Sequence, residues 1–308
     1  MITGRSRHIR QNYIKPPTHL MINTTDTLKT PASITVPHQE ISVKELSLMV
    51  GPCAVEDLDT LYQIATSLKQ AGVNVLRGGA FKPRTAPDSF QGLGETGLRY
   101  LRQVADEVGM TVVTEAMDTR HVELVVSYTD IIQVGSRNMH NSALLREVGR
   151  SKKPVLLKRG MSATLSEFVQ AANYIIHEGN NKIIFCERGI RTISDTSRFT
   201  LDLAVIHRLK ELGDTIVIVD PSHSSGESQL VPKMAKAAIA AGADGLLIEV
   251  HPDPRHALCD GRQAVLLENF PTLADELRQV YAAVRHPDQR CSNNSNITAV
   301  DSTNDNLV

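Results

Sequence analysis

The chain of 308 residues has no tryptophan, only four cysteines and no excess of either charge, with a net charge of −1 at pH 7. The cysteines are far apart and lack CxxC spacing, which argues against a disulfide framework or structural zinc and fits a reducing compartment. Basic residues are spread along the chain, so we expect neither nucleic acid nor a membrane as a partner. No apolar run suits a signal peptide or a membrane span. These absences predict a cytoplasmic protein in which any anion is bound by a local cluster of cations.

The two ends of the chain differ in composition from the long stretch between them. Residues 1–45 carry several arginines and then a run rich in threonine and proline, while residues 286–308 are rich in asparagine, serine and threonine. Such segments bury too little apolar surface to fold alone. We therefore expect a mostly flexible N-terminal arm, which could hold only a short β-hairpin near residues 34–43, and a disordered C-terminal tail. An organelle transit peptide is the alternative for the arginine-rich start.

Residues 46–285 alternate between short β-branched runs and longer segments with apolar residues at helical spacing. The expected strands cover residues 46–50, 73–76, 111–114, 130–134, 154–157, 182–185, 215–219 and 245–250. The expected helices include 58–70, 97–108, 165–177, 197–212 and 231–241, each followed by a glycine at its C-cap. Eight such units with strands apolar throughout are typical of a single-domain (β/α)8 TIM barrel. A doubly wound open sheet is the alternative, but residues 51–53 (Gly-Pro-Cys) lack its glycine-rich dinucleotide turn.

The residues that follow the expected strands include an unusual number of cations. In a TIM barrel the loops after the strands form one mouth, so side chains far apart in the sequence meet there. Six cations in one mouth would repel one another unless anions lay between them, and two phosphates with one carboxylate would balance them. The six are Arg77, Lys82, Arg84, Arg137, Lys158 and Arg188. For Arg159 and Arg191, which also follow strands, we allow the simpler interpretation that each pairs with a neighbouring glutamate.

A second group of strand-end residues consists of side chains that bind metals. They follow the first, seventh and eighth strands, which are neighbours where a barrel closes, and they are Cys53, His223, Glu249 and Asp260. Taken singly, a cysteine is usually a small buried side chain and a strand-end histidine usually bonds the main chain. Together they predict a site for a divalent metal such as Mn, Fe, Co or Zn. His251 and His256 compete as ligands, and spacing does not decide between the histidines.

Seven segments, in this order and spacing, resemble the 3-deoxy-D-arabino-heptulosonate 7-phosphate (DAHP) synthases, in the short microbial class related to 3-deoxy-D-manno-octulosonate 8-phosphate synthase. They are residues 51–56 (Gly-Pro-Cys-Ala-Val-Glu), 76–85 (Leu-Arg-Gly-Gly-Ala-Phe-Lys-Pro-Arg-Thr), 89–94 (Ser-Phe-Gln-Gly-Leu-Gly), 157–160 (Leu-Lys-Arg-Gly), 186–191 (Cys-Glu-Arg-Gly-Ile-Arg), 219–224 (Val-Asp-Pro-Ser-His-Ser) and 249–252 (Glu-Val-His-Pro). The resemblance implies a TIM-barrel transferase that uses a divalent metal to condense phosphoenolpyruvate with erythrose 4-phosphate and water. The products are DAHP and phosphate, in the first step of the shikimate pathway of aromatic amino acid biosynthesis. Lys-Pro-Arg-Thr at 82–85 marks the erythrose 4-phosphate users, whereas the octulosonate enzymes carry Lys-Ala-Asn-Arg-Ser there.

The resemblance also implies roles for individual residues. The metal ligands would be Cys53, His223, Glu249 and Asp260. The phosphate of phosphoenolpyruvate would be held by Arg137, Lys158 and Arg188. Its carboxylate would face Arg77, with Lys82 and Lys158 close by, and the aldose phosphate would be held by Arg84 and Thr85. The candidate catalytic residues are Lys82, as proton donor to the new hydroxyl, and His223. Two departures border the pocket: residues 135–141 read Gly-Ser-Arg-Asn-Met-His-Asn where the family usually has Gly-Ala-Arg-Asn-x-Gln-Asn, and Ser225 stands where glycine is common. They leave open which aldose phosphate is preferred.

Other functions stay open on the residues alone. An octulosonate-type enzyme would use arabinose 5-phosphate instead of erythrose 4-phosphate. A Schiff-base aldolase would use Lys158 to form an imine, and a non-catalytic barrel would only bind phosphate ligands.

We expect a homo-oligomer, either a dimer or a tetramer. Cys259 directly precedes Asp260, so we expect oxidation to link it to Cys53 and expel the metal. Because the N-terminal arm is short and polar, we expect no strong feedback inhibition by aromatic amino acids, chorismate or prephenate.

Overall fold

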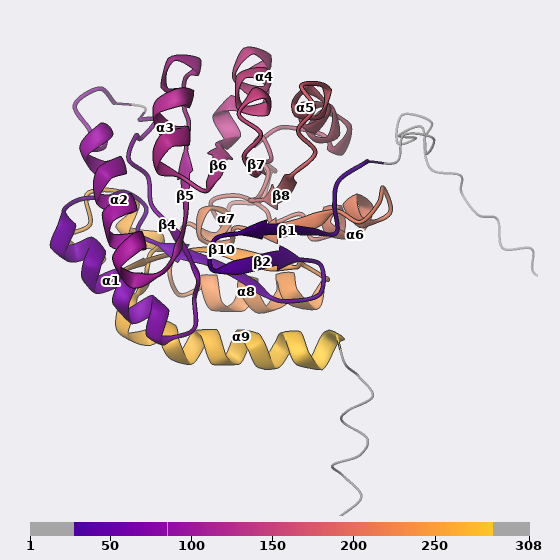
Figure 1. Cartoon of the computed structure of the whole chain (residues 1–308). Coiled ribbons are helices and arrows are strands. Elements are labelled where there is room, and N and C mark those ends of the chain that lie inside the picture. Colours follow the sequence, from indigo (N-terminus) through magenta and orange to yellow (C-terminus); the bar gives the residue numbers. More distant parts are fainter. Residues whose placement is uncertain (1–27, 85, 286–308) are drawn as a thin grey trace, which may run out of the picture.

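Eight parallel strands close into a barrel in the computed structural model, which describes residues 28–84 and 86–285 (Figure 1). β10 pairs with both β3 and β9 and so completes the ring. The strands are β3 (Ser47–Gly51), β4 (Val75–Arg77), β5 (Thr111–Glu115), β6 (Ile131–Val134), β7 (Val155–Lys158), β8 (Ile183–Glu187), β9 (Ile216–Val219) and β10 (Gly245–His251). The predicted (β/α)8 barrel and its eight strands are confirmed. The predictions for residues 1–27 and 286–308 concern segments outside the described residues.

Helices surround the barrel on its outer side (Figure 1), except for the one-turn α7 (Pro221–Ser225), which directly follows β9 at the mouth. They are α1 (Leu58–Gln70), α2 (Glu95–Val108), α3 (Val122–Tyr128), α4 (Ser142–Arg150), α5 (Leu165–His177), α6 (Ala204–Lys210), α7 (Pro221–Ser225), α8 (Val231–Ala240) and α9 (Phe270–Arg285). One-turn 3₁₀ helices lie at η2 (Thr119–His121), η3 (Ser136–Asn138), η4 (Gly261–Gln263) and η5 (Leu267–Asn269), and β11 (Val265–Leu266) extends the sheet beside β10. The helix starts follow from the sequence, since Asp57 caps α1 and Thr164 with Glu167 forms a capping box on α5. Within the described residues, none of the helices combines the length and the apolar character needed to cross a membrane.

The helix predicted over residues 197–212 is wrong in its first half, because α6 begins only at Ala204. The backbone amides of Arg198 and Phe199 instead donate to the carbonyls of Ser225 (3.2 Å) and Ser224 (2.8 Å). Thr200 exchanges two backbone hydrogen bonds with Ile190. Because these peptide groups already have partners outside a helix, residues 197–203 form a loop that lies against α7.

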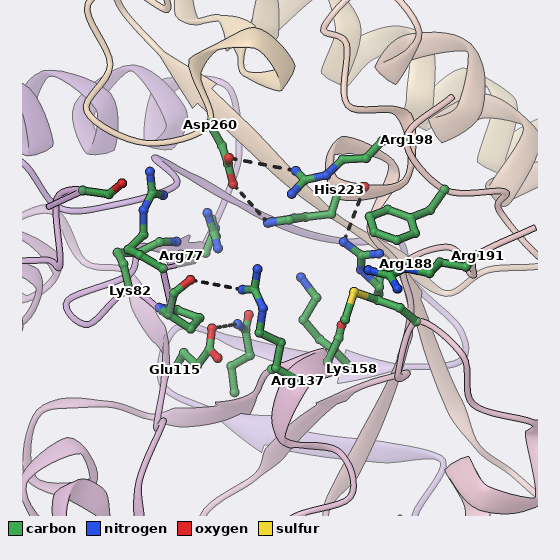
Figure 2. Close-up of a pocket in the computed structure, with 18 of the residues that line it drawn as sticks. Arg77, Lys82, Glu115, Arg137, Lys158, Arg188, Arg191, Arg198, His223 and Asp260 are labelled. Atoms are coloured by element: carbon green, nitrogen blue, oxygen red, sulfur yellow. Dashed lines mark hydrogen bonds and ion pairs between the residues drawn. The ribbon is translucent and has the colours of Figure 1, made fainter. Parts of the chain in front are cut away.

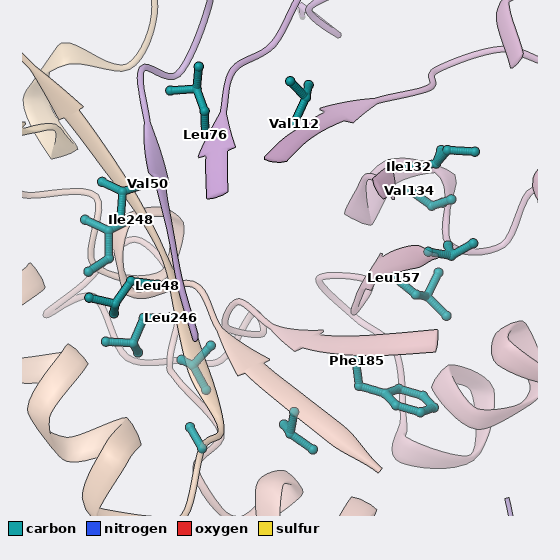
Figure 3. Close-up of a cluster of buried hydrophobic side chains, with 14 of the residues drawn as sticks. Leu48, Val50, Leu76, Val112, Ile132, Val134, Leu157, Phe185, Leu246 and Ile248 are labelled. Carbon is teal, nitrogen blue, oxygen red and sulfur yellow. The ribbon is translucent and has the colours of Figure 1, made fainter. Parts of the chain in front are cut away.

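Successive residues of each barrel strand are buried on opposite sides of the sheet, which explains the uninterrupted apolar runs. One set packs outward against the helices (Figure 3); it includes Leu48, Val50, Leu76, Val112, Ile132, Val134, Leu157, Phe185, Leu246 and Ile248. The other set fills the inside of the barrel and includes Met49, Val75, Val113, Ile131, Leu156, Ile184, Ile216 and Leu247. Each fully buried aliphatic side chain of this kind contributes about 1.5–3 kcal/mol relative to exposure. The barrel interior is therefore a packed core.

A short antiparallel hairpin covers the end of the barrel where the strands begin. It consists of β1 (Ser33–Val36) and β2 (Gln39–Ser42), within the segment where the sequence allows a hairpin, and Ile34 lies opposite Ile41. The buried side chains of Ile34, Val36 and Ile41 pack onto the inner apolar set of the barrel. Since this end is covered by apolar contacts, ligands have access at the other end, where the strands finish.

Candidate active site

All six predicted cations line one cavity of about 630 Å³ at the carboxyl ends of the strands (Figure 2). Two further guanidinium groups, those of Arg191 and Arg198, also line it. The carboxylates in the lining are Glu115 and Asp260. The cavity is therefore strongly cationic and suits ligands with several negative charges. Thr85 lies outside the described residues, so its predicted contact with the aldose phosphate stays a prediction.

Two of the six cations are held in place by buried carboxylates. Arg77 Nη1 donates to Glu249 Oε1 at 2.7 Å and to the carbonyl of Pro52 at 2.8 Å. Lys158 Nζ lies 2.5 Å from Asp220 Oδ2. All four of these charged side chains are at most 5% exposed, so each pair balances charge that would otherwise be costly to bury. The pairs fix Arg77 and Lys158 before any substrate arrives.

Arg188 is buried, and no carboxylate of the described residues pairs with it. Within this part of the chain, its guanidinium meets only the carbonyls of Gly189 and His223, at 3.4 and 3.5 Å, and stacks over the ring of Phe199 at 4.1 Å. Burial lowers the pKa of Arg188, and its Nε has no hydrogen-bond partner among the described residues. A buried guanidinium without a carboxylate costs free energy. Its position at the cavity wall indicates a binding group for an anion.

Arg159 and Arg191 differ, although both follow strand ends. Arg159 pairs with Glu187 at 3.1 Å and with Asp202 at 2.8 Å, and it does not line the cavity. The interpretation that this arginine merely pairs with a neighbouring glutamate is therefore confirmed for Arg159. Arg191 lines the cavity, and no acidic side chain of the described ranges pairs with it. That interpretation is wrong for Arg191, which adds a cation to the mouth.

The four predicted metal ligands lie together, with one ligand atom from each within 4.8 Å of the others. Cys53 Sγ is 3.5 Å from Asp260 Oδ2, and His223 Nε2 is 3.5 Å from Glu249 Oε1 and 3.9 Å from Asp260 Oδ2. A thiol, an imidazole and two carboxylates at this spacing fit a borderline divalent ion.

The competing histidines have other contacts and do not join this group. His251 Nε2 lies 3.4 Å from Glu56, and His256 Nδ1 lies 2.6 Å from Asp253. His223 is thus the histidine that the fold brings to the three other ligands.

The charges around His223 favour the protonation states that bind metals. Burial would raise the pKa of Glu249, but His223, Arg77 and Lys82 outweigh it and lower that pKa to about 2. Burial lowers the pKa of His223. Asp220 Oδ2 lies 2.7 Å from His223 Nδ1, which leaves Nε2 free to face the other ligands. A neutral imidazole oriented by a carboxylate, beside an ionised glutamate, is the form in which these side chains ligate metals.

Cys53 lies in a cluster of thiols and cations. Its Sγ is 3.1 Å from the Sγ of Cys259 and 3.0 Å from Lys82 Nζ, and Arg84 Nη1 contacts Cys259 Sγ at 2.8 Å. The hydrogen bond between the thiols raises the pKa of Cys53 well above its usual value and lowers that of Cys259 to about 7. Cys259 is therefore a thiol of raised reactivity beside a proposed metal ligand.

Several side chains that complete the site were not among the residues predicted to form it. Asp220 carried a signal, since it lies three residues before His223 and caps α7. Gln133 Nε2 donates to Glu115 Oε2 at 3.0 Å, and a side chain at Gly135 would lie 2.0 Å from Glu115 Oε1. Gln263, from η4, donates to Glu249. Glutamines of this kind carry no sequence signal, because only the tertiary fold brings them to the site.

Comparisons with known proteins agree with this geometry. A family model described as the DAHP synthetase I family matches residues 37–286. A phospho-2-dehydro-3-deoxyheptonate aldolase of Thermotoga maritima is 49% identical over 238 residues, which cover 77% of this chain and 70% of that protein. A 2-dehydro-3-deoxyphosphooctonate aldolase of Syntrophotalea carbinolica is 31% identical over 258 residues, covering 78% and 92%. The crystal structure of the Thermotoga maritima enzyme, also called DAHP synthase, superposes with a TM-score of 0.81 at 46% identity, covering 83% of this chain and 75% of that one.

Proposed function

The chain belongs to the DAHP synthetase I family, and from this premise we propose that its mouth condenses phosphoenolpyruvate with erythrose 4-phosphate and water, giving DAHP and inorganic phosphate. This reaction is the first step of the shikimate pathway. The observation that carries the proposal is one cavity that is lined by six cations and by His223 and Asp260, two members of the group of four metal-binding side chains. The two substrates together carry two phosphates and one carboxylate, whose negative charges the cations can balance. The aldehyde oxygen of erythrose 4-phosphate needs an electrophile to polarise it, and a bound metal can supply this.

The residues that would hold the divalent metal are Cys53, His223, Glu249 and Asp260. When bound, a metal of the Mn, Fe, Co or Zn type supplies Lewis acidity to the aldehyde oxygen. Asp220 orients His223 for this task through the 2.7 Å contact at Nδ1. Arg77 balances the charge of Glu249.

The cationic side chains bring together two substrates that repel each other. The proposed phosphate site for phosphoenolpyruvate is formed by Arg137, Lys158 and Arg188, and Arg77 with Lys82 faces its carboxylate. Arg84 is proposed to bind the aldose phosphate. Holding two anions in a reactive orientation is a large contribution to the rate, because it replaces a bimolecular encounter. The fixed positive charges also stabilise the negative charge that develops during the reaction.

The proton transfers can be assigned to side chains around the cavity. C3 of phosphoenolpyruvate forms a bond to the aldehyde carbon, and the aldehyde oxygen takes a proton that we assign to Lys82. Lys82 is 8% exposed; burial would lower its pKa, but the neighbouring thiols Cys53 and Cys259 outweigh burial and raise it. Water then adds at C2, and the C2–O bond to phosphate breaks to release inorganic phosphate.

We assign the proton of that water to Glu115. This carboxylate lines the cavity, is oriented by Gln133 and, among the described residues, has no cation paired with it. It is thus the cavity carboxylate free to accept a proton.

A phosphate-release assay tests the proposal against its alternatives. Erythrose 4-phosphate should support release with one or more of Mn²⁺, Fe²⁺, Co²⁺ and Zn²⁺, and a chelator should abolish it. Preference for arabinose 5-phosphate would indicate an octulosonate-type enzyme. Loss of activity on borohydride treatment with substrate, together with resistance to chelator, would indicate an imine at Lys158 and contradict the proposal.

Two further parts of the proposal concern the setting of the enzyme. We propose that the chain acts as a homo-oligomer, either a dimer or a tetramer, and in the cytoplasm. Sedimentation of the purified protein tests the first, and fractionation of cells that express the full chain tests the second. A monomer at micromolar concentration would contradict the oligomer.

A further inference from the structure

Gln263 is a buried glutamine that contacts two of the proposed metal ligands. It ends η4 and is 2% exposed. Its Nε2 donates to Glu249 Oε2 at 2.7 Å, and its backbone amide donates to the carbonyl of Asp260 at 3.1 Å. At the other end of the side chain, Oε1 accepts from Arg198 Nη1 at 3.0 Å. Gln263 thus connects Glu249 and Asp260 with the loop that carries Arg198 (Figure 2 shows Arg198 beside Asp260).

The chemistry of its two neighbours fixes the orientation of the Gln263 amide. A guanidinium group can only donate hydrogen bonds, so Arg198 must face the amide oxygen. An ionised carboxylate can only accept, so Glu249 must face the amide nitrogen. A glutamate at this position would place a second carboxylate against Glu249, and an apolar residue would remove the hydrogen bonds at Glu249 Oε2 and Arg198 Nη1. The amide matches both requirements at once.

The two carboxylate oxygens of Glu249 consequently have different neighbours. Oε2 is occupied by Gln263, whereas Oε1 lies 3.5 Å from His223 Nε2, on the side of the other ligands. Oε1 also receives Arg77 Nη1 at 2.7 Å. The carboxylate is therefore held in one rotation, with one oxygen turned toward the metal group.

We propose that Gln263 is a positioning residue that holds Glu249 so that it binds the metal through Oε1 alone. Outer partners of this kind orient ligands, and their loss typically costs 10-fold to 100-fold in metal affinity. A single-oxygen ligand also keeps a coordination position free for a substrate oxygen. The inference rests on the proposed function, since it assumes that the four-residue group binds a metal.

The test compares Co²⁺ binding to the full chain in four variants. Gln263→Met removes the amide, and Gln263→Asn keeps an amide that is one methylene too short. Arg198→Met removes the contact at Gln263 Oε1 together with the 3.9 Å ion pair between Arg198 and Asp260, and it leaves the amide in place. Gln103→Met is the matched control, because Gln103 makes the same kind of contact with Glu107, at 3.2 Å, on the exposed face of α2. The dissociation constant and the visible spectrum of bound Co²⁺ are measured for each, with circular dichroism to verify the fold.

We expect Gln263→Met to raise the Co²⁺ dissociation constant about 10-fold to 100-fold and to change the visible spectrum. Gln263→Asn should lie between this variant and the wild type, while Gln103→Met should match the wild type. Arg198→Met should have a smaller effect than Gln263→Met, because the amide can still donate to Glu249. A purely structural role for Gln263 would lower the melting temperature without changing the spectrum.

Wild-type affinity and an unchanged spectrum in folded Gln263→Met would overturn the inference and leave the proposed function intact. If Gln263→Met does not fold, wild-type behaviour in Gln263→Asn overturns the inference in the same way. If the wild-type chain itself binds no Co²⁺ and releases no phosphate with any of the metals, both the inference and the proposed function are wrong.

Discussion

The two ends of the eight-stranded barrel differ in the kind of side chain that covers them. At the closed end, Ile34, Val36 and Ile41 of the hairpin cover the inner core with apolar contacts. At the mouth, eight cations surround a cavity of about 630 Å³, and acidic side chains pair with only some of them. Burial of apolar surface stabilises the fold, whereas burial of charge is costly. Apolar contacts at the closed end therefore contribute mainly to the stability of the fold, whereas the charged groups at the mouth are available for binding and catalysis.

The largest effect is expected from Cys53→Ala at the mouth. Loss of the thiolate should reduce phosphate release to the level of the chelated wild-type enzyme. Cys53 is 4% exposed and therefore not the surface-facing ligand that its strand-end position suggests. Its small apolar cluster should still limit the loss in the free energy of unfolding to about 1 kcal/mol. Full turnover of the variant after metal stripping would show that the proposed ligand group is wrong.

Asp220→Asn tests an exception to this difference between the two ends, because Asp220 lies at the mouth and yet contributes to the stability of the fold. The change leaves buried Lys158 without its carboxylate, so we expect a loss of about 3–5 kcal/mol in the free energy of unfolding near neutral pH. The pKa of Asp220 is well below its usual value, since His223 and Lys158 outweigh the effect of burial. Its stabilising contribution is therefore present above the unfolded pKa of about 3.9 and is lost as the pH falls below it.

Urea unfolding at a series of pH values tests this prediction. The stability difference between the wild type and Asp220→Asn should be greatest near neutral pH and should shrink in acid. A difference that stays constant, or grows, as the pH falls below about 4 would contradict the assignment of Asp220 as an ionised partner.

Ile41→Ala tests the closed end. The side chain is fully buried, and its truncation should cost about 2–5 kcal/mol through lost burial and a cavity. Turnover per folded molecule and Co²⁺ affinity should match the wild type, because the change lies at the end of the barrel away from the ligands. Thermal unfolding and phosphate release measured on the same sample check this. A fall in turnover of the folded protein would show that the two ends are coupled.

Oxidation is the smallest expected effect, because reductant should reverse it. The sulfur atoms of Cys53 and Cys259 are 3.1 Å apart, so a mild thiol oxidant should link them and release the metal. Inactivation and its reversal by reductant are measured on the wild type and on Cys259→Ser. Reductant-reversible inactivation that persists in Cys259→Ser would exclude this pairing.

Much of the fold and of the ligand group follows from the sequence alone. The eight apolar runs predict the barrel because strands buried on both faces are mostly apolar, and the barrel in turn brings all strand ends to one mouth. The positions of Cys53, His223, Glu249 and Asp260 after the strands are therefore sufficient to predict that they meet, and the same holds for the six cations. Apolar residues at helical spacing, with a glycine after each helix, also predicted α1 and α5 with their observed bounds.

The tertiary structure alone decided which of these charges have partners. Arg159 and Arg191 both follow a strand end, yet within residues 28–84 and 86–285 only Arg159 meets acidic groups, which come from the neighbouring strand and from the loop before α6. Residues 197–203 had helical periodicity, but backbone partners on α7 and at Ile190 kept them as a loop. Gln263 shows the same limit, since its contacts with Glu249 and Arg198 join residues 14 and 65 positions away. The periodicity of apolar residues indicates only which face of a segment is buried. Hydrogen bonds and ion pairs depend instead on which distant segments the closed barrel brings to within about 3 Å of each other.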